Sequence, residues 1–225
     1  MLPHIILESG DKPQHSIIWL HGLGADGNDF VPIVDELHLP VAIRYIFPHA
    51  PQQAVTVNGG FVMPAWYDIF SGDIAAQQDA VGIRASQREI EQFIAQEIGR
   101  GIRAKNIFLA GFSQGGAIAL HTALRQTAPL GGVLALSCYL PLATTFTGEA
   151  QSACRQTPIF MGHGRADPIV PYTLGMRSKN ILEASGYRVD WHEYSMQHNV
   201  CSAELTDIGT WLTQALTETP DTRAL

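Results

Sequence analysis

The segment Gly111-Phe112-Ser113-Gln114-Gly115-Gly116 constrains the fold more than any other part of the chain. It follows the apolar run 106–110, typical of a buried strand, and precedes the apolar stretch 117–125, which predicts a helix. A serine at such a junction, with glycines two positions away on each side, is typical of a sharp turn that exposes its hydroxyl. The helix behind it would point N–H groups and a positive dipole end at developing negative charge. The segment therefore predicts a nucleophile elbow and acyl transfer through Ser113. The alternative is a glycine-rich packing turn with a solvated serine.

The length and composition predict one domain over residues 1–225, with a full hydrophobic core. A net charge of −7 offers no basic surface for nucleic acid and suits a small-molecule substrate. No run approaches the roughly 18 apolar residues that span a bilayer, and residues 1–8 lack the basic start of a secretory signal. Cys138, Cys154 and Cys201 fit reduced thiols better than a disulfide framework, so we expect a cytoplasmic protein.

Apolar runs alternate with helical patterns along the chain. Strands are expected at 4–8, 16–20, 42–47, 106–110, 132–137, 158–161 and 188–194, and helices at about 75–99, 117–125, 172–184 and 200–216. This alternation predicts an α/β fold, with a mostly parallel central sheet and helices on both faces. The tail 217–225 is expected to fray.

A serine hydroxyl is a weak nucleophile and needs a base within hydrogen-bond reach. On an elbow of this kind the partners follow in the order serine, acid, histidine, which leaves three histidines to consider. His163 precedes the acid candidate, and His192 falls inside the alternating strand 188–194. His198 follows that strand, where the chain turns into the last helix, and such loops build sites in α/β sheets. We therefore expect His198 to be the base.

The acid must orient the imidazole and stabilise its charged form. Asp167 follows the strand 158–161 through a short loop, so it is expected at the same edge of the sheet. Its alternative role is that of a carboxylate at a helix N-terminus. Asp190 lies within a strand and Glu183 within a helix, which makes Asp167 the better candidate.

An oxyanion hole needs two backbone N–H donors. One is expected from Gln114, the residue after the nucleophile, and the other from the loop after the strand 16–20. That loop holds three glycines within residues 21–27, and Leu23 is its expected donor. The chain lacks a metalloprotease His-Glu-x-x-His pattern, and the glycines after Gly22 lack the dinucleotide spacing. We expect no metal and no cofactor.

One segment, 48–72, breaks the alternation and is rich in proline, glycine and aromatic residues. A loop of this length is often a binding loop or lid. Phe70, Met63 and Trp66 are therefore candidate substrate-binding residues. A structural cap over the core is the alternative and stays open.

Five segments together resemble the phospholipase/carboxylesterase family, which includes small bacterial type II carboxylesterases and acyl-protein thioesterases. They are HGLGADG at 21–27, MPAWYD at 63–68, GFSQGG at 111–116, His163-Gly164 with Asp167 and Val170-Pro171, and Tyr194 with Met196 and His198. The resemblance covers about residues 3–216. It implies an α/β-hydrolase fold with almost no cap, Ser113, Asp167 and His198 as the triad, and Leu23 and Gln114 as the oxyanion hole.

Three functional hypotheses follow. The main one is a serine carboxylesterase that hydrolyses short- to medium-chain acyl esters, because the spelling of 21–27 is more like the bacterial carboxylesterases. The alternative is an acyl-protein thioesterase or lysophospholipase that uses the same residues. The third is a binding protein that keeps the fold without turnover. The expected substrate is a small acyl ester or thioester. The expected assemblies include a homodimer.

Overall fold

The computed structural model describes residues 1–217; the rest of the tail that was expected to fray, 218–225, lies outside the described residues. Within residues 1–217, seven strands form one sheet in the order β1-β3-β2-β6-β7-β8-β9. Their bounds are His4–Glu8 (β1), His15–Leu20 (β2), Ile43–Pro48 (β3), Ile107–Phe112 (β6), Gly132–Leu136 (β7), Ile159–Gly164 (β8) and Val189–Tyr194 (β9). Only β1 is antiparallel to its neighbour, β3; the other neighbouring strands run parallel. The predicted mostly parallel sheet is confirmed.

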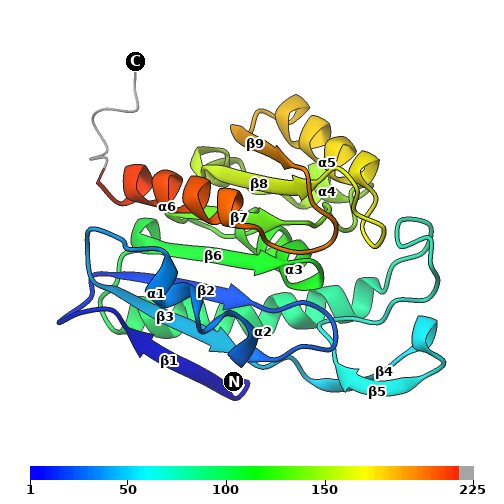
Figure 1. The fold of residues 1–225 in the computed structure, drawn as a ribbon, viewed down its shortest axis with the longest axis horizontal. Helices are drawn as coiled ribbons and strands as arrows, with labels where there is room; N and C mark the ends of the chain where they lie inside the picture. The colour runs from blue at the N-terminus through cyan, green and yellow to red at the C-terminus, as the bar shows by residue number, and fades with distance from the viewer. Residues whose placement is uncertain (218–225) are drawn as a thin grey trace.

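Helices cover both faces of this sheet (Figure 1). Their bounds are Ile33–Glu36 (α1), Ala80–Gly99 (α2), Gln114–Ala123 (α3), Phe146–Glu149 (α4), Tyr172–Ala184 (α5) and Ser202–Thr217 (α6). Helices α2, α3, α4 and α5 share one apolar cluster with the sheet, and α1 and α6 share a second. Strand β2 contributes to both clusters, because successive side chains of a strand point to opposite faces of the sheet. Ile17 and Trp19 join the second cluster, whereas Ile18 and Leu20 join the first. A strand buried on both faces reads as a continuous apolar run.

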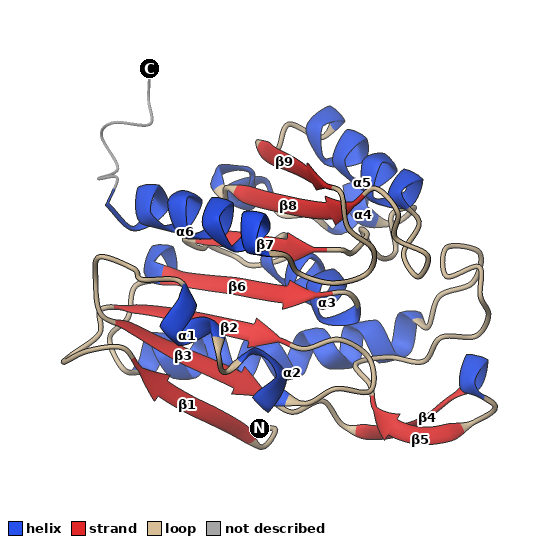
Figure 2. Ribbon diagram, in the orientation of Figure 1, coloured by secondary structure: helices blue, strands red, loops and turns tan. Residues whose placement is uncertain are grey.

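The segment 48–72 is not a plain loop. It holds an antiparallel hairpin, β4 (Gln52–Val55) with β5 (Phe61–Pro64), joined through a short 3-10 helix over Thr56–Asn58. Gly59 and Gly60 turn the chain with φ of 68° and 79°. The prolines and glycines that suggested a loop thus lie mostly at the ends and turn of the hairpin. It projects beyond the sheet at the end where the parallel strands finish (Figure 2).

The strand order places the expected site loops together. Gly111 pairs with Leu20, Phe112 with Leu136, and Gly164 with Tyr194. The residues that follow β2, β6, β8 and β9 therefore lie at one edge of the sheet. In α/β folds, sites form at this edge, outside the carboxyl ends of the strands. Among residues 1–217, every helix is too short or too polar to cross a membrane.

Candidate active site

Ser113 stands at the junction of β6 and α3 in a backbone conformation that L-residues rarely adopt, with φ of 54° and ψ of −121°. Its N–H donates to the Leu136 carbonyl at 2.8 Å, which ties the turn to the next strand. A Cβ on Gly111 would collide with the backbone of Gly115, and a Cβ on Gly115 would collide with the carbonyls of Leu20 and His21. Both glycines of the predicted elbow are thus required by close backbone approach.

Ser113, His198 and Asp167 form a continuous hydrogen-bonded series. His198 Nε2 lies 2.8 Å from Ser113 Oγ, and His198 Nδ1 lies 2.7 Å from Asp167 Oδ2. The other carboxylate oxygen, Oδ1, accepts the N–H groups of Ile169 and Val170 at 2.8 and 2.9 Å. Because a carboxylate only accepts, Nδ1 carries the proton in this pair. Nε2 is left to accept the proton of the Ser113 hydroxyl.

The loops that carry the acid and the histidine are bound to each other through their backbones. The N–H groups of Arg165 and Ala166 donate to the carbonyls of Tyr194 and Met196 at 2.9 and 3.1 Å. A Cβ on Gly164 would overlap the Met196 carbonyl, so the two chains touch there. The relative position of Asp167 and His198 is therefore set by paired main chain.

Within residues 1–217, the N–H groups of Gln114 and Leu23 have no hydrogen-bond acceptor. The Gln114 N–H is the first of α3, where a helix supplies no acceptor. The Leu23 N–H donates to no group in the described part of the chain, whereas the next N–H, of Gly24, donates to the Pro64 carbonyl at 2.9 Å. Gly24 has φ of 78°, a conformation that suits glycine.

The side chain of Gln114 and the ring of Trp66 hold these loops together. Gln114 Oε1 accepts the Trp66 N–H at 2.8 Å, and Gln114 Nε2 donates to the Tyr67 carbonyl at 2.7 Å. The indole N–H of Trp66 donates to the His21 carbonyl at 2.9 Å. Trp66 was expected to contact substrate, but its ring is 1% exposed and its N–H is used internally. We therefore assign it a supporting role.

Met63 and Phe70, the other expected substrate-binding residues, are both half-buried. The Met63 sulfur accepts Asn58 Nδ2 at 3.4 Å and would lie 3.7 Å from a Cβ on Gly24. Met63 thus borders the loop of Leu23. Neither residue lines a cavity of about 470 Å³ that lies further along the chain, between the segment 72–75 and the start of α5. That cavity is lined by Gly72, Asp73, Ile74, Ala75, Pro171, Thr173, Leu174 and Arg177.

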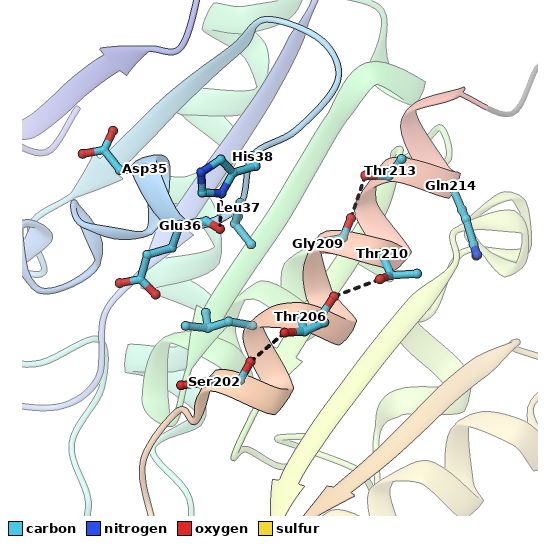
Figure 3. A pocket seen from close by; sticks show the side chains of 11 residues that line it. Asp35, Glu36, Leu37, His38, Ser202, Thr206, Gly209, Thr210, Thr213 and Gln214 are labelled. Carbon is cyan, nitrogen blue, oxygen red and sulfur yellow. Dashed lines mark hydrogen bonds between the residues drawn. The ribbon is translucent and has the colours of Figure 1, made fainter.

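A larger cavity, of about 770 Å³, lies between α1 and α6 (Figure 3). Its threonine hydroxyls are already bound within the helix; those of Thr206, Thr210 and Thr213 donate to carbonyls one turn back at 2.8–3.0 Å. Ser113, Asp167 and His198 do not line it. We therefore assign no part of the reaction to this cavity.

The remaining histidines of interest lie outside the Ser113–His198–Asp167 series. His192 faces Asp190 and Asp207 and stacks on Phe160. His21 accepts the Ala50 N–H at Nε2, and burial lowers its pKa. Among residues 1–217, no cluster of histidine, cysteine and acidic side chains could hold a metal ion.

Comparison with known proteins identifies the family. Residues 3–216 match the family described as Phospholipase/Carboxylesterase. The chain belongs to this family. The assignment makes it a serine hydrolase of the ester-cleaving type, as the elbow predicted.

Relatives and solved structures agree with this assignment. Acyl-protein thioesterase 1 of Neurospora crassa is 36% identical over 97% of this chain and 94% of its own length. The protein of the same name from Yarrowia lipolytica is 34% identical over 97% of this chain and all of its own. The structure of acyl-protein thioesterase 2 from Zea mays superposes with a TM-score of 0.84, at 28% identity over 96% of this chain and 100% of that one. The α/β-hydrolase fold implied by the resemblance is confirmed.

Proposed function

We propose that this protein is a serine thioesterase that hydrolyses acyl groups from cysteine thiols of proteins. The observation that carries the proposal is the series Ser113–His198–Asp167, with distances of 2.8 and 2.7 Å. The choice of a thioester over an oxygen ester is supported by relatives named acyl-protein thioesterase at 34–37% identity over nearly the whole chain. The second candidate is a carboxylesterase for short- to medium-chain esters, which the spelling of residues 21–27 favours.

The reaction proceeds through an acyl-enzyme in this proposal. Ser113 Oγ attacks the carbonyl carbon while His198 Nε2 takes its proton, and the carbonyl oxygen becomes negative. The N–H groups of Leu23 and Gln114 stabilise that oxyanion. The carbon–sulfur bond then breaks, and the proton on His198 goes to the departing thiolate. Water, deprotonated by His198, attacks the acyl-serine, and the carboxylic acid leaves as the proton returns to Ser113 Oγ.

The Asp167 carboxylate orients His198 and stabilises its charged form during both halves of the reaction. Its own orientation is fixed because Oδ1 binds two backbone N–H groups and Oδ2 faces His198. No step needs a metal or a cofactor, since His198 supplies the base that activates the serine.

The acyl chain, in this proposal, lies across the surface between the β4–β5 hairpin and the start of α5. Met63 borders the loop of Leu23 on one side of this surface. Ile74, Pro171 and Leu174 supply apolar walls to the cavity on the other side. These apolar walls favour a hydrocarbon chain over a charged acid, and the charged Asp73 and Arg177 also line the cavity.

Two measurements test the proposal. A fluorophosphonate should label wild-type protein at Ser113 and leave Ser113→Ala unlabelled; absence of labelling would support a binding protein without turnover. A peptide with an S-acyl cysteine, compared with nitrophenyl esters of equal acyl length, then separates the two candidates. The two substrates differ in leaving group, a cysteine thiol against a nitrophenol, and the comparison corrects for this difference. A higher corrected kcat/KM for the thioester supports the thioesterase. A marked preference for short oxygen esters supports the carboxylesterase.

A further inference from the structure

His163 lies directly beneath the loop that carries Asp167, at the end of β8. Its ring is 1% exposed and packs against two aromatic rings that also contact each other, with Trp191 of β9 stacked at 6.0 Å between centroids and Tyr172 edge-on at 6.2 Å. On the α5 side it meets Gly175, where a Cβ would lie 2.6 Å from Nδ1. The ring is therefore held in one orientation by its surroundings.

The polar atoms of this buried ring have a defined use. Nε2 lies 2.9 Å from the Val170 carbonyl oxygen, which only accepts, so Nε2 carries the proton and donates it there. Burial lowers the pKa of His163, outweighing the raising effects of the Val170 carbonyl and Asp167. The ring is thus a neutral donor at physiological pH.

Val170 joins this histidine to the proposed catalytic acid. The Val170 carbonyl accepts from His163, and the Val170 N–H donates to Asp167 Oδ1 at 2.9 Å. Nε2 of His163 also lies 3.6 Å from Asp167 Oδ2, the oxygen that faces His198. The turn from Asp167 to Val170 is therefore fixed from below by one side chain. No step of the proposed reaction uses this side chain.

We infer that His163 is a positioning residue for Asp167, holding the 167–170 turn so that Oδ2 stays aimed at His198. The inference rests on the proposed function of the Ser113–His198–Asp167 series. Loss of the donor would free the Val170 peptide to rotate and carry the Asp167 carboxylate with it. A displacement of about 1 Å in such a group can lower the rate about 100-fold.

The direct test compares two substitutions of His163. His163→Met keeps the volume and removes the donor, whereas His163→Gln keeps a donor nitrogen at a similar reach. We expect kcat to fall about 10- to 100-fold in His163→Met with little change in KM, and to recover largely in His163→Gln. The matched control is His121→Met, because His121 is also fully buried and bonded, to Gln87 at 3.0 Å, but lies away from Asp167. An equal fall in kcat for both Met variants, or wild-type kcat in His163→Met, overturns the inference.

A double-mutant cycle separates positioning from general destabilisation. In an Asp167→Asn background, His163→Met should have little further effect on kcat, because the group that it positions is already lost. An undiminished effect in that background overturns the inference. The cycle also distinguishes failure of this inference from failure of the proposed function. If Asp167→Asn itself leaves kcat unchanged, the proposed function fails.

A second variant applies where His163→Met does not fold. Gly175→Ala keeps the histidine at position 163 but puts a methyl group against its Nδ1, which forces the ring to shift. Alanine favours a helix over glycine by about 1 kcal/mol, so α5 itself is not weakened. We expect kcat to fall as the ring is displaced, with the fall again absent in the Asp167→Asn background. Unchanged kcat in Gly175→Ala overturns the inference.

Discussion

The indole N–H of Trp66 donates to the carbonyl oxygen of His21 at 2.9 Å, although 45 residues separate the two in sequence. Trp66 follows the β4–β5 hairpin, and His21 begins the loop that contains Leu23. The same Trp66 offers its backbone N–H to Gln114 Oε1 at 2.8 Å. One buried residue thus fixes both segments that supply the proposed oxyanion hole relative to each other.

Removing this indole N–H should lower the rate more than the affinity. Trp66→Phe leaves the buried His21 carbonyl without its donor, which costs about 1–3 kcal/mol of stability. Leu23 lies two residues after His21, so a shift of this loop also shifts the Leu23 N–H of the proposed oxyanion hole. We therefore expect kcat to fall, by less than the 10²–10³-fold seen when an oxyanion donor is deleted. Steady-state kinetics and urea unfolding measure the two effects.

Trp19→Phe is the matched control for this prediction. Trp19 is also fully buried, but in the described part of the chain its indole nitrogen has no hydrogen-bond partner. Its replacement should change stability without the same fall in kcat. Equal falls in kcat for the two variants would show that the Trp66–His21 bond has no role in catalysis.

The proposed nucleophile and base should act as a unit. Ser113→Ala is expected to lower kcat by about 10⁴-fold or more, and His198→Ala by nearly as much. The double variant should be little worse than either single variant, because each alone already disables the shared step. Turnover of one ester by the four proteins provides the measurement. Losses that multiply, or a Ser113→Ala variant with most of its activity, would contradict this mechanism.

The sequence identifies Ser113, His198 and Asp167 better than it identifies the residues that hold them in position. The order of the chain after Ser113 leads to Asp167 and His198, since each follows a strand of one parallel sheet. The long-range partners of Gln114 give no such signal, because its side chain binds backbone atoms of residues 66 and 67. Backbone groups are the same at every position, so no pattern marks them.

Trp66 shows a related limit of sequence analysis. An aromatic residue in a long connecting segment is as consistent with a wall of a site as with a packed support, and only burial separates the two. The hairpin β4–β5 was missed for another reason, since each strand has four residues. Such short strands give too little alternation for a period to show.

Stability should depend on pH through Glu204, which is fully buried in the first turn of α6. Burial raises its pKa from 4.5 to about 8, and the neighbouring Cys201 N–H opposes this without forming a hydrogen bond of good geometry. The native state therefore binds this proton more tightly than the unfolded state. The contribution of this protonated carboxyl to the free energy of unfolding is fully present below pH 4.5. It is lost as pH rises toward 8, by at most about 1.4 kcal/mol per pH unit.

Glu204→Gln tests this directly, because glutamine stays neutral throughout. Urea unfolding between pH 5 and 8 should show a smaller decline in the free energy of unfolding for the variant than for wild type. Glu183→Gln, at an exposed position in α5, controls for the loss of one negative charge and should keep the wild-type slope. Parallel curves for wild type and Glu204→Gln would mean that Glu204 is charged in the native protein at neutral pH.

The length of the acyl chain should separate two positions for its binding surface. Each CH₂ that becomes buried contributes at most about 0.8 kcal/mol, so kcat/KM should rise along a series of acyl substrates until the surface is filled. If the hairpin side forms the wall, Met63→Ala with Phe70→Ala should shorten the preferred chain. If the cavity beside α5 takes the chain, Leu174→Ala should change the preference for longer chains only, because Leu174 lines that cavity whereas Met63 borders the loop of Leu23. An unchanged length profile in all three substitutions would place the acyl chain elsewhere and leave the hairpin as a structural cap.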